Sequence, residues 1–192
     1  MKNLITHLQS IATGNTVLGF LIAATSIYLI MLLHTIPQVM QYAPEMKLFD
    51  MSPTGYSFSY AVDLLNALGV EGRGAYLYQQ LPVDFIYPGL FAVSCCLLLT
   101  WLFSKSINGN SKMFYLCLVP VLAGFFDYFE NICIVNMLIS YPDITENHVF
   151  ISSGFTVLKS GLTMVFFVIL MLGFVLLLKS RWTENRQYKS ES

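Results

Sequence analysis

The sequence predicts an all-α membrane protein in which four transmembrane helices form an antiparallel bundle. Three observations lead to this fold class. Of the 192 residues, 56% are hydrophobic and only 11% are charged, whereas a soluble domain carries roughly 25% charged residues. Four stretches are predominantly apolar over the ~20 residues that a membrane helix needs. Lysine and arginine are unevenly divided between the connections, as expected when successive helices cross in opposite directions.

The chain is predicted to form one domain over 1–182, followed by a polar tail over 183–192. The four spans are expected at about 16–37, 75–103, 113–139 and 154–178. The first contains no Asp, Glu, Lys or Arg and is longer than the ~7–15 apolar residues of a signal-peptide core. It is therefore interpreted as a retained helix. Before it, Leu4, Ile5, Leu8 and Ile11 recur at helical spacing, which favours a short interfacial helix or a frayed terminus.

The long connection over 38–74 is predicted to contain a short amphipathic helix at about 57–68. Gly69 follows it and is a suitable helix stop. We expect this helix to lie on the membrane surface or to cap the bundle, because so short a segment cannot bury a core alone. Its apolar face is formed by Phe58, Ala61, Leu64, Leu65 and Leu68.

The distribution of basic residues predicts the orientation. Lys105 and Lys112 lie in the short second connection, whereas residues 143–148 of the third contain no Lys or Arg. Both termini are therefore expected in the cytoplasm, with 38–74 and 143–148 outside, in the periplasm of a Gram-negative host. The expected location is the bacterial inner membrane. The basic residues after the fourth span agree with this orientation: Lys179, Arg181, Arg186 and Lys189.

Four charged residues lie within the predicted spans: Asp84, Asp127, Glu130 and Lys159. An ionised side chain at the centre of a membrane helix costs roughly 2.5–3.5 kcal/mol on insertion scales. These groups should therefore face the bundle interior, pair, bind an ion or become neutral. A rise of ~1.5 Å per residue places all four ~8–18 Å from the outer surface. Their similar depth predicts one shared cluster in the outer half of the bilayer.

The helical faces favour the same cluster. Asp127, Glu130 and Asn131 have the i, i+3, i+4 spacing of one face, and Gly124, one turn earlier, permits a close helix approach. A second polar stripe descends the second span through Arg73, Tyr76, Gln80, Asp84, Tyr87 and Pro88. A third lies on the fourth span and comprises Thr156, Lys159, Ser160 and Thr163.

The candidate ligand-binding residues carry unequal charges. They are Asp84, Asp127, Glu130, Asn131, Lys159 and Arg73. Even if Arg73 reaches the cluster, three carboxylates face two cations and one negative charge remains. A buried carboxylate without a counter-charge takes a proton or recruits a cation. The imbalance indicates a site for a proton, a cation or a small polar ligand.

Three functions follow from this cluster. The leading hypothesis is binding or transport through a homo-oligomer or a larger membrane complex, because one four-helix unit is small for a transporter. The second is a membrane-embedded enzyme that uses a carboxyl group as acid or base on a lipid or isoprenoid. It requires a side opening beside the cluster. The third is a structural or assembly subunit, in which the charges only set the packing.

Plain structural interpretations remain open for individual residues. Asp84 and Lys159 could form a simple interhelical salt bridge, and Glu130 and Asn131 could only hydrogen-bond between helices. Pro82, Pro88 and Pro120 could only kink their helices. The sequence contains no familiar hydrolase, zinc-protease or nucleotide-binding motif. Its net charge of −1 gives no basic surface for nucleic acid. No metal site and no cofactor are assigned.

Overall fold

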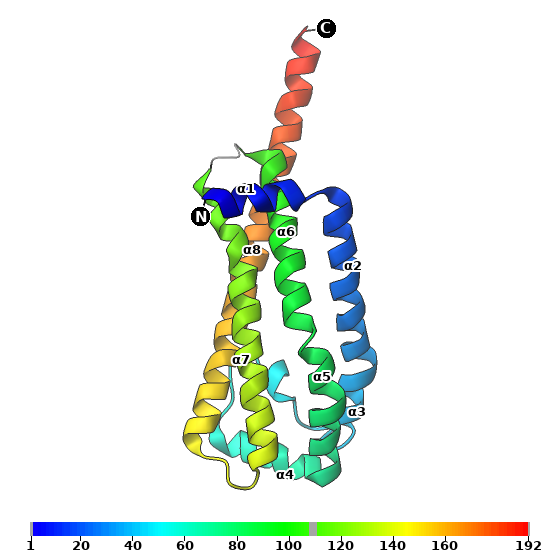
Figure 1. Cartoon of the computed structure of the whole chain (residues 1–192), viewed down its shortest axis with the longest axis vertical. Coiled ribbons are helices and arrows are strands. Elements are labelled where there is room, and N and C mark those ends of the chain that lie inside the picture. Colours follow the sequence, from blue (N-terminus) through cyan, green and yellow to red (C-terminus); the bar gives the residue numbers. More distant parts are fainter. Residues whose placement is uncertain (1, 108–110, 192) are drawn as a thin grey trace.

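The described chain is a bundle of long helices with one short helix across each end (Figure 1). The computed structural model describes the backbone of residues 2–107 and 111–191 and the side chains of residues 4–107, 111–183 and 186. Met1, residues 108–110, the side chain of Lys189 and Ser192 of the predicted tail lie outside the described residues. Within them, all regular secondary structure is helical.

Four helices of the described chain are long and apolar enough to cross a membrane. They are Gly14–Met40, Phe58–Ser106, Lys112–Ser140 and Glu146–Thr183. This confirms the predicted all-helical class and the predicted number of candidate membrane spans.

The first two spans are each assembled from consecutive helical segments. The first comprises α2 (Gly14–Ile30) and α3 (Ile36–Met40), joined by the π-helical turn Met31–Thr35. The second comprises α4, a π-helical turn, α5 and α6. Their bounds are Phe58–Ala75 for α4, Tyr76–Gln80 for the turn, Leu81–Asp84 for α5 and Tyr87–Ser106 for α6.

The last two spans are more regular. The third comprises a 3-10 turn, Lys112–Leu118, and α7 (Val119–Ser140). The fourth is the single helix α8 (Glu146–Glu191). It begins before the predicted position 154 and continues through the described part of the predicted tail.

Apart from the break at Gly69, the irregular turns within the described spans each end two residues before a proline. The π-helical turns end before Pro37 and Pro82, the break at residues 85–86 comes before Pro88, and the 3-10 turn ends before Pro120. Proline has no N–H, and its ring clashes with the carbonyl four residues earlier, so the preceding turn must widen, tighten or bend. The predicted effect of Pro82, Pro88 and Pro120 on helix geometry is therefore confirmed.

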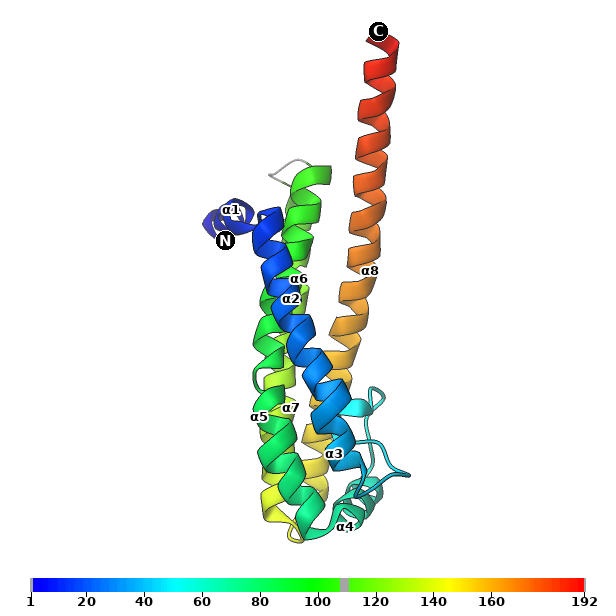
Figure 2. The ribbon, with the colours of Figure 1, turned by 90° about the vertical axis from the view of Figure 1, so that its right-hand side faces the viewer.

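The α6 helix is central, because it packs against α2, α7 and α8. The α7–α6 contact is close at Gly124, where a Cβ atom would lie 2.7 Å from the Pro88 carbonyl oxygen and 3.0 Å from Ala92 Cβ. The close approach predicted at Gly124 is thus confirmed. Figure 2 shows that α8 leans away from α2 toward the end that carries the C-terminus.

The two short helices lie across opposite ends of the bundle. The α1 helix (Lys2–Ile11) lies at the end where both chain termini are found (Figure 1). The first part of α4 covers the other end. Its predicted apolar face is buried at Ala61, Leu64, Leu65 and Leu68 and partly buried at Phe58. The backbone leaves helical geometry at Gly69, with φ 61 and ψ −170, which confirms that residue as the end of the amphipathic segment. The helix therefore caps the bundle.

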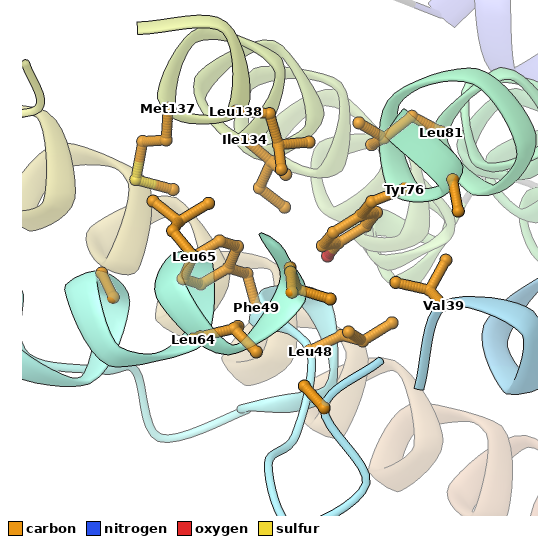
Figure 3. Packing of buried hydrophobic residues seen from close by; sticks show 14 of the residues in the cluster. Val39, Leu48, Phe49, Leu64, Leu65, Tyr76, Leu81, Ile134, Met137 and Leu138 are labelled. Atoms are coloured by element: carbon orange, nitrogen blue, oxygen red, sulfur yellow. The ribbon is translucent and has the colours of Figure 1, made fainter. Parts of the chain in front are cut away.

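Two large apolar clusters stabilise the two ends of the described bundle, and a smaller one joins Ala12, Val17 and Leu97. One lies under α4 and joins residues of the loop, α4, α5 and α7. Figure 3 shows its centre, with Leu48, Phe49, Leu64, Leu65, Tyr76, Leu81, Ile134, Met137 and Leu138. The second lies toward the α1 end, around Leu99, Phe103, Phe114 and Phe166. Asp84 of α5, Asp127 and Glu130 of α7 and Lys159 of α8 lie between the residues of the two clusters in chain order.

Candidate functional site

Lys159 of α8 lies between two carboxylates of α7. Its Nζ is 2.9 Å from Asp127 Oδ1, and it forms a second ion pair with Glu130 Oε2. The two carboxylates share one face of α7 because they are three residues apart. Glu130 is fully buried, and the side chains of Asp127 and Lys159 are only 12% and 15% exposed. The structure thus brings together three of the predicted site residues in one interhelical group.

Side-chain hydroxyls extend the network of ion pairs toward the α4 end of the bundle. Thr156 Oγ1 donates to Glu130 Oε1 at 2.6 Å. One turn earlier on α8, Ser152 Oγ accepts a hydrogen bond of 2.7 Å from the Tyr56 hydroxyl, and Ser153 Oγ accepts one of 2.9 Å from the Tyr56 backbone N–H. Burial raises the pKa of Tyr56 above its usual range, so its hydroxyl stays protonated and can donate. These hydrogen bonds hold the loop before α4 against the start of α8.

Asp84 lies beside this group but is held differently. Asn131 Nδ2 donates to the backbone carbonyl of Asp84 at 3.3 Å. That carbonyl lies four residues before Pro88, which has no N–H to donate to it. The interhelical hydrogen bond that the sequence suggested for Asn131 is therefore formed.

The Asp84 carboxylate itself remains unpaired. Asp84 is 3% exposed, and among the described residues its Oδ2 has no hydrogen-bond partner. Lys159 pairs with Asp127 and Glu130, and the described chain contains no ion pair between Lys159 and Asp84. The simple Asp84–Lys159 salt bridge considered from the sequence is therefore not formed.

Arg73 does not join the cluster. Its Nη1 donates to the Leu65 carbonyl at 2.8 Å, and its guanidinium lies 4.6 Å from the centre of the Tyr141 ring. Both contacts are made at the α4 end of the bundle. Arg73 is thus placed away from the carboxylates that it was predicted to balance.

Two polar contacts near the cluster were not predicted. Asp50, in the 3-10 turn Phe49–Met51, accepts a hydrogen bond of 2.6 Å from the hydroxyl of the fully buried Tyr76. It lies close enough to Asp84 for the two carboxylates to repel each other. In addition, Thr35 of the first span donates to Gln80, and both residues are buried. The loop that contains Asp50 therefore enters the bundle end and adds an acidic group.

An open cleft with a volume of about 440 Å³ lies beside the ion pairs. Its polar residues are Asp127, Lys159, Ser160 and Thr163. Its other walls are apolar or aromatic and come from α6, α8 and the loop: Pro53, Tyr87, Phe91, Met164 and Phe167. The volume is within the ~300–1,000 Å³ range of small-molecule sites. The cleft thus connects the charged group to the outer surface of the helices.

The site combines an excess of carboxylates with little exposure to solvent. Asp84, Asp127 and Glu130 face one ammonium, that of Lys159, so the group has a net charge of −2 when all four are ionised. A proton or a cationic group would relieve this imbalance.

Comparisons of the chain with protein-family models, with curated proteins and with solved structures gave no match.

Proposed function

We propose that this protein is an integral membrane protein that binds or passes a proton, a cation or a small polar ligand at its buried acidic site. The observation that carries the proposal is the Lys159 ion-pair group, in which one ammonium pairs with two carboxylates, while the neighbouring Asp84 forms no ion pair with any residue whose side chain is described. Charged groups inside membrane spans are costly and are characteristic of ion and substrate pathways.

In this proposal the four spans form an antiparallel bundle with both termini in the cytoplasm, in a bacterial inner membrane. Both chain ends lie at the same end of the long axis (Figure 1). Lys105 and Lys112 flank the connection between the second and third spans, which supports the assignment of the α1 end to the cytoplasm. The acidic site then belongs to the outer half of the bilayer. Assembly into a homo-oligomer or a larger complex is part of the same proposal.

The test compares the purified protein with Asp127→Asn and Glu130→Gln. Proton uptake is counted by acid–base titration, and thermal unfolding is followed with ammonium, sodium or calcium chloride at equal ionic strength. A ligand at one hundred times its Kd stabilises the folded protein by about 2.7 kcal/mol. We expect at least one of these probes to act on the wild type and to lose its effect in both variants.

The matched control is Asp63→Asn, which removes an exposed carboxylate of α4 and should leave the effect of each cation on thermal unfolding unchanged. If both site variants fold and respond to all probes as the wild type does, the proposal is wrong.

The cleft favours a second candidate function, a membrane-embedded enzyme that acts on a lipid or isoprenoid. Asp127 and Lys159 line an opening with aromatic and apolar walls, the arrangement that such an enzyme requires beside its acid or base. Turnover of a lipid or isoprenoid substrate by the wild type, lost in Asp127→Asn, would favour the enzyme over a binding protein.

A further inference from the structure

The cleft beside Asp127 is open on the side of the bundle. Its α8 wall includes Met164 and Phe167, which are 72% and 55% exposed, and its α6 wall includes Tyr87 and Phe91. Residues this apolar face hydrocarbon when the helices span a membrane. A molecule that enters past these side chains must therefore be soluble in the bilayer.

The inner end of the same cleft is polar. Asp127 and Lys159 reach it, together with Ser160 and Thr163. One Asp127 oxygen binds Lys159, but a carboxylate offers about four acceptor positions. The site can thus accept further hydrogen bonds from an incoming donor.

The charge of the site selects the chemistry of that donor. Glu130 shares Lys159 with Asp127, and Asp84 is near enough to interact electrostatically with all three, so the four groups together carry an excess of negative charge. An anionic headgroup would be repelled by this field, whereas a protonated amine would be attracted. A primary amine resembles the Lys side chain and is protonated at neutral pH.

We infer that the cleft between α6 and α8 binds an amphiphile whose end group is a protonated amine. The amine lies at Asp127, and the apolar chain lies along Phe91, Met164 and Phe167 at the lipid boundary. This inference rests on the proposed function, because it assigns the ligand class of the same acidic site.

The test measures equilibrium binding of dodecylamine, dodecanol and dodecanoic acid at neutral pH, in one detergent and at one mole fraction. The three probes share a chain, so their insertion into the micelle is similar and the end group makes the difference. We expect dodecylamine to bind at least about tenfold more tightly than dodecanoic acid. Asp127→Asn should remove this preference.

A second variant tests the cleft without changing a charge. Thr163→Trp fills the cleft and should abolish binding of dodecylamine. Its matched control is Met171→Trp, at a position of α8 that is 66% exposed and does not line the cleft. Equal binding of dodecylamine and dodecanoic acid, or unchanged dodecylamine binding in Thr163→Trp, would overturn the inference.

Ethylamine separates this inference from the proposed function. If ethylamine binds as tightly as dodecylamine and depends on Asp127, the acidic site holds a water-soluble cation and the amphiphile is excluded. If neither amine binds and the titrations also show no effect of Asp127 or Glu130, both proposals fail.

Discussion

Lys159 makes both ion pairs of the site, so its removal has a larger effect than the loss of one contact. It separates Asp127 from Glu130 and neutralises part of their charge. Without it, two carboxylates on one face of α7 would lie next to each other, and one of them is fully buried.

We therefore expect Lys159→Met to lower the free energy of unfolding by about 3–5 kcal/mol, the usual effect of leaving a buried charge without its partner. Adding Glu130→Gln should restore part of that loss, because the double variant retains only one of the two carboxylates that Lys159 had paired. Unfolding of the purified proteins by a denaturing detergent measures both changes. A double variant less stable than Lys159→Met would contradict this account of the pair.

The sequence predicted several contacts at this scale but could not rank competing partners. Helical spacing placed Asp127 and Glu130 on one face, and depth placed Lys159 in the same outer half of the bilayer. Arg73 was assigned to the same group because it continues the stripe of Asp84. Eight residues span ~12 Å of a straight helix, so the Leu65 carbonyl that binds Arg73 was not an evident partner from the spacing.

Helix α7 approaches α6 so closely at Gly124 that a side chain cannot be added without movement. The nearest atom to a new Cβ would be a backbone oxygen, that of Pro88, at 2.7 Å. A backbone atom cannot move aside as the end of a flexible side chain can. The glycine thus fixes the distance between α7, which carries Asp127, and α6, which follows Asp84 in the same span.

Gly124→Ala should destabilise the protein by about 1–3 kcal/mol, as overpacking of a close interface does. Gly161→Ala is the matched control, because Gly161 is also helical and a Cβ there meets nothing within 4 Å. Since alanine favours helix by up to about 1 kcal/mol over glycine, the control should be neutral or stabilising. Thermal unfolding of the two variants gives the comparison, and equal effects would argue against the close contact.

The spans themselves were predictable because long, predominantly apolar runs are characteristic of membrane helices. The loop before α4 was not. Phe49 is fully buried against Tyr56 and Tyr76, but no periodic pattern within the loop indicates this. Its burial depends on rings from other segments, and so does the position of Asp50. The conformation of a short loop is therefore not predicted by the sequence when the loop packs against residues far away in the chain.

At the scale of the whole molecule, the proposed orientation places two exposed residues on opposite sides of the membrane. Ser104 precedes the connection after α6, and Asp143 lies in the connection between α7 and α8. A membrane-impermeant maleimide should label Asp143→Cys in intact cells and label Ser104→Cys only after permeabilisation.

The native cysteines provide the background for this labelling. Cys95, Cys96 and Cys117 are buried and Cys133 is partly buried, so the unmodified protein should react little. Labelling of Ser104→Cys alone in intact cells would place the acidic site in the cytoplasmic half of the bilayer and would reverse the proposed orientation.

Because the cleft opens on the side of the bundle, the ligand concentration that determines binding is the one in the lipid phase. A ligand that arrives through the lipid is diluted by lipid or detergent molecules and not by the volume of water around them. Its occupancy would follow its mole fraction in the bilayer, and adding detergent at constant total ligand would empty the site. Purification in excess detergent would therefore tend to yield the unliganded protein, and reconstitution at a defined lipid ratio would refill it.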